Sequence, residues 1–265
     1  MNLFLRELKA CRRSLILWCL GMLFVVSGSM GKFSGFSASG QSANEMISVI
    51  PESVRIVLGF GNFDLSLAIG FYGVVFGYVA IMAAIHATIT GATVISKEER
   101  DKTAEFLMAK PISRNTVITA KLAAAFMNIL VLNLVTYGIS YALVDYYSDT
   151  VSYAGDIALL MAGLLVLQLI FMLLASAAAA VMKRPKASVS VASGIMLALY
   201  LLDKIIDLNR DLDFLKYLTP FKYFNAVNIL GDTSFEAVFA ILSTVLVGML
   251  LYITFASFRK RDMII

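Results

Sequence analysis

Long apolar stretches without charge alternate with short charged segments along the whole 265-residue chain. Six such stretches occur, at approximately 14–31, 65–96, 122–144, 157–182, 187–202 and 237–258. Each is near or beyond the roughly 17–25 residues that an α-helix needs to cross the hydrocarbon layer of a membrane. Ten-residue alternating segments, typical of barrel strands, are missing, so helices are the expected way to satisfy the backbone in lipid. The pattern predicts an all-α polytopic membrane protein with six transmembrane helices.

Residues 1–13 carry one apolar stripe beside several basic side chains. Phe4, Leu8 and Cys11 recur at helical spacing, while the basic residues fall on other faces. This pattern is typical of an amphipathic helix that lies in the membrane interface, with its basic face toward lipid headgroups. The alternative is that these residues form the beginning of the first span.

The second apolar stretch, 65–96, is too long for a simple span. Its 32 residues would form a helix of about 48 Å, against roughly 30 Å of hydrocarbon. We therefore expect it to project beyond the membrane into the charged segment that follows. Gly73 and Gly77 form a GxxxG pattern, which allows close helix packing either between two chains or inside one.

Basic residues are distributed unevenly around these stretches. The chain has 22 Lys and Arg, 18 Asp and Glu, and a formal net charge of +4. Sixteen of the 22 basic residues fall on the side that holds both termini and segments 97–121 and 183–186. Because basic loops remain in the cytoplasm, we expect both termini of this cell-membrane protein to be cytoplasmic. Membrane orientation accounts for the basic clusters, so no nucleic-acid partner is expected.

Residues suited to catalysis or metal binding are scarce. Cys11 and Cys19 lie at or inside the first span, and no Cys/His metal spacing occurs, so neither a disulfide framework nor a metal site is expected. The single histidine, His86, lies deep in the second stretch, where it either lines a cavity or is packed. The spans carry no acidic residue, which disfavours two alternatives, a membrane-embedded enzyme and an ion-coupled secondary carrier.

Segment 97–114, KEERDKTAEFLMAKPISR, interrupts the apolar pattern with nine charged side chains in 18 residues. A short helix from Glu98 to Ala109 is predicted, ended by Pro111, with Ser113 as the N-cap of the next helix. The predicted helix has an apolar centre of Phe106, Leu107 and Met108. Around it we expect a charged rim of Glu98, Glu99, Arg100, Asp101, Lys102 and Glu105. An apolar centre with a polar rim is typical of a protein-binding patch, the alternative being a solvated loop.

The longer sequence KEERDKTAEFLMAKPISRNTVITAK resembles the cytoplasmic segment of the ATP-binding-cassette type 2 (ABC-2-type) permease family. The matching positions are Glu98, Glu99, Thr103, Glu105, Phe106, Leu107, Pro111, Ser113, Arg114 and Lys121. A glycine commonly precedes the threonine in that family, whereas this chain has Lys102. The six spans, the amphipathic start and the Pro220–Phe221 pair before the last span also fit, so the resemblance covers most of the chain.

The resemblance implies one transmembrane permease domain, residues 1–265, in which 97–114 form a coupling helix hairpin docked on a separate cytoplasmic ABC ATPase subunit. The implied ATPase contacts are Glu98, Glu99, Asp101, Lys102, Thr103, Glu105, Phe106, Leu107, Met108, Pro111 and Arg114. It also implies two permease chains, as a homodimer or a related pair, working with two ATPase chains in membrane lipid.

The chain has no nucleotide-binding motif of its own. Its only Gly-Lys pair, Gly31–Lys32, has Val26 where the first glycine of a P-loop belongs. ATP and Mg are therefore expected in the partner subunit, and this chain is expected to bind no cofactor and to be a transporter subunit, not an enzyme. The resemblance implies export, and the uncharged spans rich in Phe, Met, Leu and Ala favour hydrophobic or amphipathic cargo (peptide or toxin, antibiotic or lipid), with amphipathic peptides as the first expectation.

Overall fold

The computed structural model describes residues 3–38, 48–60, 63–103, 112–148, 151–182, 184–232 and 234–260. Its long helices are α1 (Leu3–Ala38), α4 (Ala68–Arg100), α6 (Arg114–Tyr146), α7 (Ala154–Val181), α8 (Pro185–Leu208) and α11 (Ala237–Lys260). All six are long and apolar enough to cross a membrane. The described residues form no β-strand. The predicted all-α architecture with six spans is confirmed.

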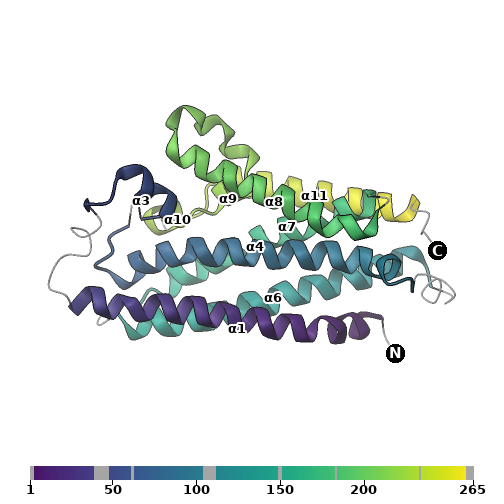
Figure 1. The fold of residues 1–265 in the computed structure, drawn as a ribbon, viewed down its shortest axis with the longest axis horizontal. Coiled ribbons are helices and arrows are strands. Elements are labelled where there is room, and N and C mark those ends of the chain that lie inside the picture. The colour runs from purple at the N-terminus through teal and green to yellow at the C-terminus, as the bar shows by residue number, and fades with distance from the viewer. Residues whose placement is uncertain are drawn as a thin grey trace.

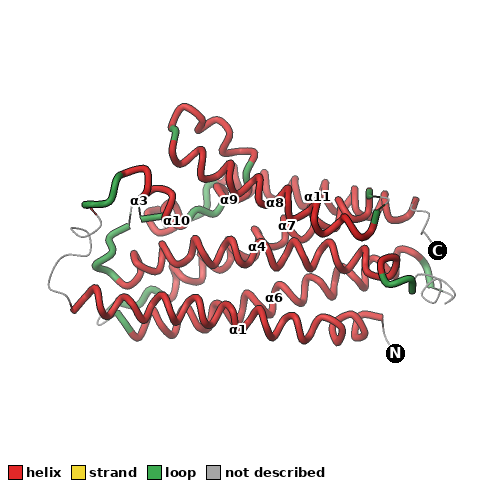
Figure 2. Tube along the Cα trace, viewed as in Figure 1, coloured by secondary structure: helices red, strands yellow, loops and turns green. Residues whose placement is uncertain are grey.

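The six long helices form one elongated bundle with loops gathered at its two ends (Figures 1 and 2). One end, here called the termini end, holds both chain termini and the turn that follows α4 (Figure 1). The other, here called the loop end, holds the short helices α3 (Glu52–Leu58), α9 (Pro220–Tyr223) and α10 (Ala226–Asp232). A 3₁₀ helix, η1 (Arg210–Leu218), connects α8 to α9.

Helix α1 contains both the predicted interfacial segment and the first predicted span. It runs from Leu3 to Ala38 without a break, so residues 3–13 are not a separate helix. Continuity is expected physically, because the segment has neither a proline nor a glycine before Gly21 to end the helix. The location of residues 3–13 in the membrane interface stays a prediction.

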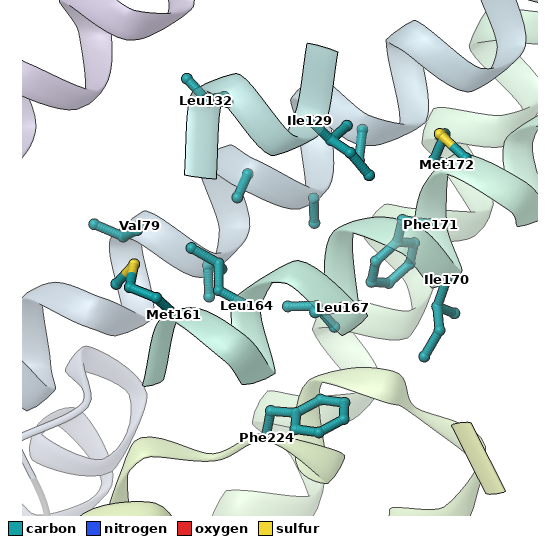
Figure 3. Packing of buried hydrophobic residues seen from close by; sticks show 14 of the residues in the cluster. Val79, Ile129, Leu132, Met161, Leu164, Leu167, Ile170, Phe171, Met172 and Phe224 are labelled. Carbon is teal, nitrogen blue, oxygen red and sulfur yellow. The ribbon is translucent and has the colours of Figure 1, made fainter. Parts of the chain in front are cut away.

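The core is centred on α7, which packs against α4, α6 and α11. Figure 3 shows Leu164, Leu167 and Phe171 of α7 among the buried residues, with Ile129 of α6 and Phe224 from the α9–α10 connection nearby. Most of the apolar window of α4 and of α7 is buried, whereas only 17–22% of the apolar windows of α1, α8 and α11 is buried. Helices α4 and α7 therefore form the interior of the bundle, and α1, α8 and α11 present apolar faces outward.

Helices α4 and α7 approach each other closely at Gly91. A Cβ atom at Gly91 would lie 2.1 Å from the carbonyl oxygen of Met172, closer than any real contact. The Oγ of Ser176 donates hydrogen bonds to the carbonyl oxygens of Gly91, at 3.0 Å, and Met172, at 2.8 Å. Only glycine therefore permits this approach, which is the packing use of small residues in membrane helices.

The two glycines of the GxxxG pattern have different surroundings. A Cβ at Gly73 would lie 2.5 Å from the ring of Phe63, so Gly73 accommodates an aromatic side chain of its own chain. A Cβ at Gly77 would have no heavy atom within 4 Å. Packing inside one chain therefore accounts for Gly73, and a contact between two chains through Gly77 stays a prediction.

Candidate functional site

The predicted coupling hairpin lies at the termini end of the bundle. The structure describes its two bases, up to Thr103 and from Ile112 onward. Five of its predicted contact residues lie outside the described part of the chain: Glu105, Phe106, Leu107, Met108 and Pro111. The predicted coupling helix and its ATPase contacts therefore stay predictions, and the described site is the base that holds the hairpin.

The first base is the C-terminus of α4. The predicted helix from Glu98 is wrong at its beginning, because Glu98, Glu99 and Arg100 form the last turn of α4 and a turn follows at Asp101. The sequence misled here because the charged residues end the apolar run but do not end the helix. They continue to donate and accept the same backbone hydrogen bonds.

The turn after α4 is closed by Lys102 in the left-handed conformation, with φ of 56°. The amide of Thr103 donates to the carbonyl oxygen of Glu98 at 2.8 Å, and the amide of Lys102 donates to that of Glu99 at 3.4 Å. These two bonds form a Schellman motif, which usually has glycine at the left-handed position. Lys102 occupies the position where the ABC-2-type permeases commonly have glycine, and its backbone takes the conformation that glycine adopts most easily.

The second base is the N-terminus of α6. The predicted N-cap is confirmed, because the Oγ of Ser113 accepts a hydrogen bond from the amide of Thr116 at 3.1 Å. The guanidinium of Arg114 donates to the carbonyl oxygen of Arg259 at 2.9 Å, and the Nε of Arg259 donates to the side chain of Asn115 at 2.8 Å. These contacts join the beginning of α6 to the end of α11.

Between the two bases, a buried ion pair joins α4 to α6. The Nζ of Lys121 donates to the carboxylate of Glu98 and, at 2.7 Å, to the carbonyl oxygen of Val94. Lys121 is only 1% exposed and Glu98 only 5%. The expectation that Glu98 belongs to an exposed rim is therefore corrected, because the helix turns its side chain toward α6.

A third helix, α1, joins this pair through Glu7, which is fully buried. The carboxylate of Glu7 accepts from Lys97 at 2.6 Å and from Arg6 at 3.2 Å. Arg6 also approaches the second carboxylate oxygen of Glu98 at 3.4 Å. We call the five residues Arg6, Glu7, Lys97, Glu98 and Lys121 the buried ion network.

The buried ion network makes the hairpin base rigid. Removing one member of a buried ion pair typically costs roughly 3–5 kcal/mol, because the other charge is left buried without compensation. The two helices that flank the hairpin, α4 and α6, are joined in this network by Glu98 and Lys121. Helix α1 joins them through the ion pairs of Glu7 and Arg6. Helices α1, α4 and α6 are therefore coupled at the termini end.

Four predicted contacts are exposed at the hairpin base. They are Asp101, Lys102, Thr103 and Arg114, and Glu99 is partly buried. Among the predicted ATPase contacts that the structure describes, Glu98 is therefore buried and the others are exposed or partly exposed. Their contact with an ATPase stays a prediction.

Sequence reasoning missed Glu7 and assigned Lys121 only as a family position. Two features could have indicated their pairing. Glu7 is the only acidic residue before Glu45, and Lys121 is the only charged residue between Arg114 and Asp145. A lone charge beside an apolar run requires a partner when its helix is buried.

His86 is buried, at 2% exposure, between α4 and α1. Its ring lies 5.4 Å from that of Trp18, edge to face, and its Nε2 is 3.4 Å from the hydroxyl of Thr90. This is the packed alternative of the two considered for His86. No group of three His, Cys, Asp or Glu side chains suited to a metal ion occurs among the residues described.

Comparison with known proteins identifies a family for this chain. The family model described as "ABC-2 family transporter protein" matches residues 1–263. The comparison with curated proteins found no match. The family match covers nearly the whole chain, including all six spans and the hairpin.

Proposed function

The chain belongs to the ABC-2 transporter family, and on that premise we propose that it is the permease subunit of an ATP-driven exporter. Family membership and the six spanning helices identify a multi-pass membrane protein that acts in transport and not as an enzyme. The proposal adds a direction, outward, and an energy source, a separate ATPase subunit that binds ATP and Mg. It also adds an assembly of two permease chains with two ATPase chains.

The buried ion network is the observation that most supports this proposal. A coupling element transmits force only if its base does not yield when its tip is pushed. Here the base is held by Lys121 and Glu98 between α4 and α6, and by Glu7 to α1. A displacement of the hairpin would therefore move three spanning helices together.

Transport would follow from this rigidity. When two ATPase subunits close around ATP, a hairpin docked on them moves with them, and the attached helices change their tilt. A rigid-body change of this kind alters which side of a bundle is open. ATP shifts the equilibrium between the two states of the permease only by the difference in free energy between the hairpin contacts of one state and those of the other.

The orientation and the cargo belong to the same proposal. The concentration of basic residues at the termini end supports a cytoplasmic location for that end, where an ATPase is available. The uncharged spans suit hydrophobic or amphipathic cargo, of which amphipathic peptides are the first choice, ahead of antibiotics and lipids.

The test is co-purification of the full chain with the ABC ATPase encoded beside it. Replacing Phe106 and Leu107 together by Asp should abolish co-purification and ATP-dependent transport, because two charges would be forced into an apolar contact. Val49→Asp with Val54→Asp is the matched control, since both valines are exposed at the loop end, far from the hairpin. The control should retain the ATPase.

Both variants should reach the membrane in equal amount. The measure is the peak area of folded protein in size-exclusion chromatography after the membrane fraction is solubilised. An unchanged ATPase yield with the double Asp variant at the hairpin would contradict the coupling role. Failure of the unmodified chain to retain any ATPase would contradict the permease proposal itself.

A further inference from the structure

A cavity of about 550 Å³ lies at the loop end of the bundle, away from the hairpin. Its walls come from α3, from the first part of α4, from the last part of α8 and from the segment that connects α9 to α10. The volume falls within the roughly 300–1,000 Å³ typical of small-molecule sites. Four separate segments of the chain thus enclose a space large enough for a ligand.

One side of the cavity is apolar. Ile56, Val74, Phe76, Phe221 and Phe224 contribute to this wall. An open space lined by so much apolar and aromatic surface is favourable for an apolar ligand.

Gly77 of α4 also borders the cavity and leaves it open. A Cβ at this position would meet no heavy atom within 4 Å. A larger side chain at Gly77 would therefore extend into the cavity and not into the protein.

The other side of the cavity carries charges that are paired with one another. Lys204 lies 3.1 Å from a carboxylate oxygen of Asp203 and 3.4 Å from one of Asp207. Lys222 lies 3.5 Å from the other oxygen of Asp203 and pairs with Asp207. Two ammonium groups thus neutralise two carboxylates, and this group offers a ligand no net charge.

Arg55 of α3 is the exception. It lines the same cavity, and its Nε is buried without a hydrogen-bond partner. Among the residues that the structure describes, Arg55 forms no ion pair. Glu52, one turn earlier on α3, is exposed and does not pair with it. Burying part of a guanidinium without an acceptor is costly, so a ligand that supplies the acceptor would bind favourably.

From the unpaired Arg55 beside an apolar wall, we propose that this cavity binds an amphiphile with an anionic head group. The head, a carboxylate or a phosphate ester, accepts hydrogen bonds from the guanidinium of Arg55. The tail lies along Phe76, Phe221 and Phe224. Arginine presents planar donors that suit either head group.

The charges on the cavity wall disfavour two other ligand classes. A cationic amphiphile would meet Arg55, while both aspartates are already occupied by lysines. A small inorganic anion would satisfy Arg55 but leave the apolar wall uncovered.

The test uses the full chain in dodecyl maltoside and isothermal titration with dodecyl phosphate. Arg55→Gln should weaken binding about tenfold or more, and tenfold corresponds to about 1.4 kcal/mol. Lys32→Gln is the control, because it removes a basic residue that is exposed toward the end of α1, outside the cavity. The control should bind as the unmodified chain does.

A second pair of variants tests the tail. Gly77→Leu should weaken binding of dodecyl phosphate at least tenfold by filling the cavity, whereas Gly138→Leu should not. Gly138 also has no heavy atom within 4 Å of its Cβ position, but it lies on α6 outside the cavity.

Three results would overturn the proposal. Arg55→Gln and Lys32→Gln could bind dodecyl phosphate with equal affinity. The unmodified chain could bind dodecyltrimethylammonium, or inorganic phosphate alone, as tightly as it binds dodecyl phosphate.

Mass spectrometry of lipids retained on the purified chain separates the two sources of such an amphiphile. Phosphatidylglycerol retained by the unmodified chain and lost in Arg55→Gln identifies a membrane lipid, whereas dodecyl phosphate binding without a retained lipid identifies cargo. The test needs no ATPase, so its failure would leave the proposed function untouched.

Discussion

Replacing Lys121 by Met should destabilise the bundle more than any loss of a surface charge. The methionine fills a similar volume but cannot donate to Glu98 or to the carbonyl oxygen of Val94. Glu98, only 5% exposed, would retain Arg6 at 3.4 Å as its remaining cationic partner. From the range for a broken buried ion pair, we expect a loss of roughly 3–5 kcal/mol in the free energy of unfolding.

The control is an exposed ion pair of the same kind. Lys216 lies 2.8 Å from Asp213, with side chains 32% and 63% exposed. The hydrogen bond to Asp213 raises the pKa of the Lys216 ammonium, so the lysine is charged and the pair is formed at neutral pH. Water solvates both groups when the pair is broken, so Lys216→Met should cost about 0–1 kcal/mol.

The assay is unfolding by sodium dodecyl sulfate in mixed micelles, followed by circular dichroism. A second variant, Lys121→Met with Glu98→Met, should lose less than Lys121→Met alone, because no buried charge is then left without its partner. The reasoning is refuted if Lys121→Met and Lys216→Met have the same free energy of unfolding, or if the double variant is the least stable of the three.

Two further predictions concern backbone geometry and use the same unfolding assay. Lys102→Gly should raise the free energy of unfolding by about 1 kcal/mol, because glycine adopts the left-handed conformation without steric conflict. A loss of stability would show that the Lys102 side chain makes a stabilising contact. Gly91→Ala should lower the melting temperature strongly, since its Cβ would lie 2.1 Å from the carbonyl oxygen of Met172. Gly248→Ala, with no heavy atom near its Cβ, should not lower that temperature, because alanine favours a helix interior more than glycine does. Equal losses in the two variants would contradict the close approach of α4 and α7.

The number of spanning helices could be predicted from the sequence because each apolar run is long enough to cross a membrane by itself. The helix ends could not be predicted as well. The start of α6 at Arg114 was predicted through its N-cap Ser113, whereas α8 continues to Leu208, six residues beyond the predicted span. The extension of α8 includes Asp203, whose ion partners are the adjacent Lys204 and Lys222 of α9.

Glu98 and Glu99 show why the site was harder to predict than the fold. The two residues are adjacent and chemically identical, so no composition rule separates them. A helix of 3.6 residues per turn rotates each by about 100° from its neighbour, which turns Glu98 toward Lys121 and leaves Glu99 partly exposed. Only the packing of α4 against α1 and α6 decides which of them is buried.

The cavity was missed for a related reason. Its walls combine α3 with the ends of α4 and α8 and with the α9–α10 connection, segments separated by more than a hundred residues. In the sequence, Arg55 is only one of the six basic residues that do not fall on the side of the termini. That its guanidinium lacks an acceptor follows from the tertiary arrangement and from no local pattern.

Helix α4 reaches both regions without a break. Gly77 borders the cavity and Glu98 belongs to the buried ion network, and the 21 helical steps from one to the other correspond to about 32 Å of continuous helix. A rod of this length cannot tilt at one end and stay still at the other. If an ATPase and an amphiphile occupy the two ends, each must alter the affinity of the chain for the other by the same factor, so the nucleotide state could be read from ligand affinity on the opposite side of the membrane.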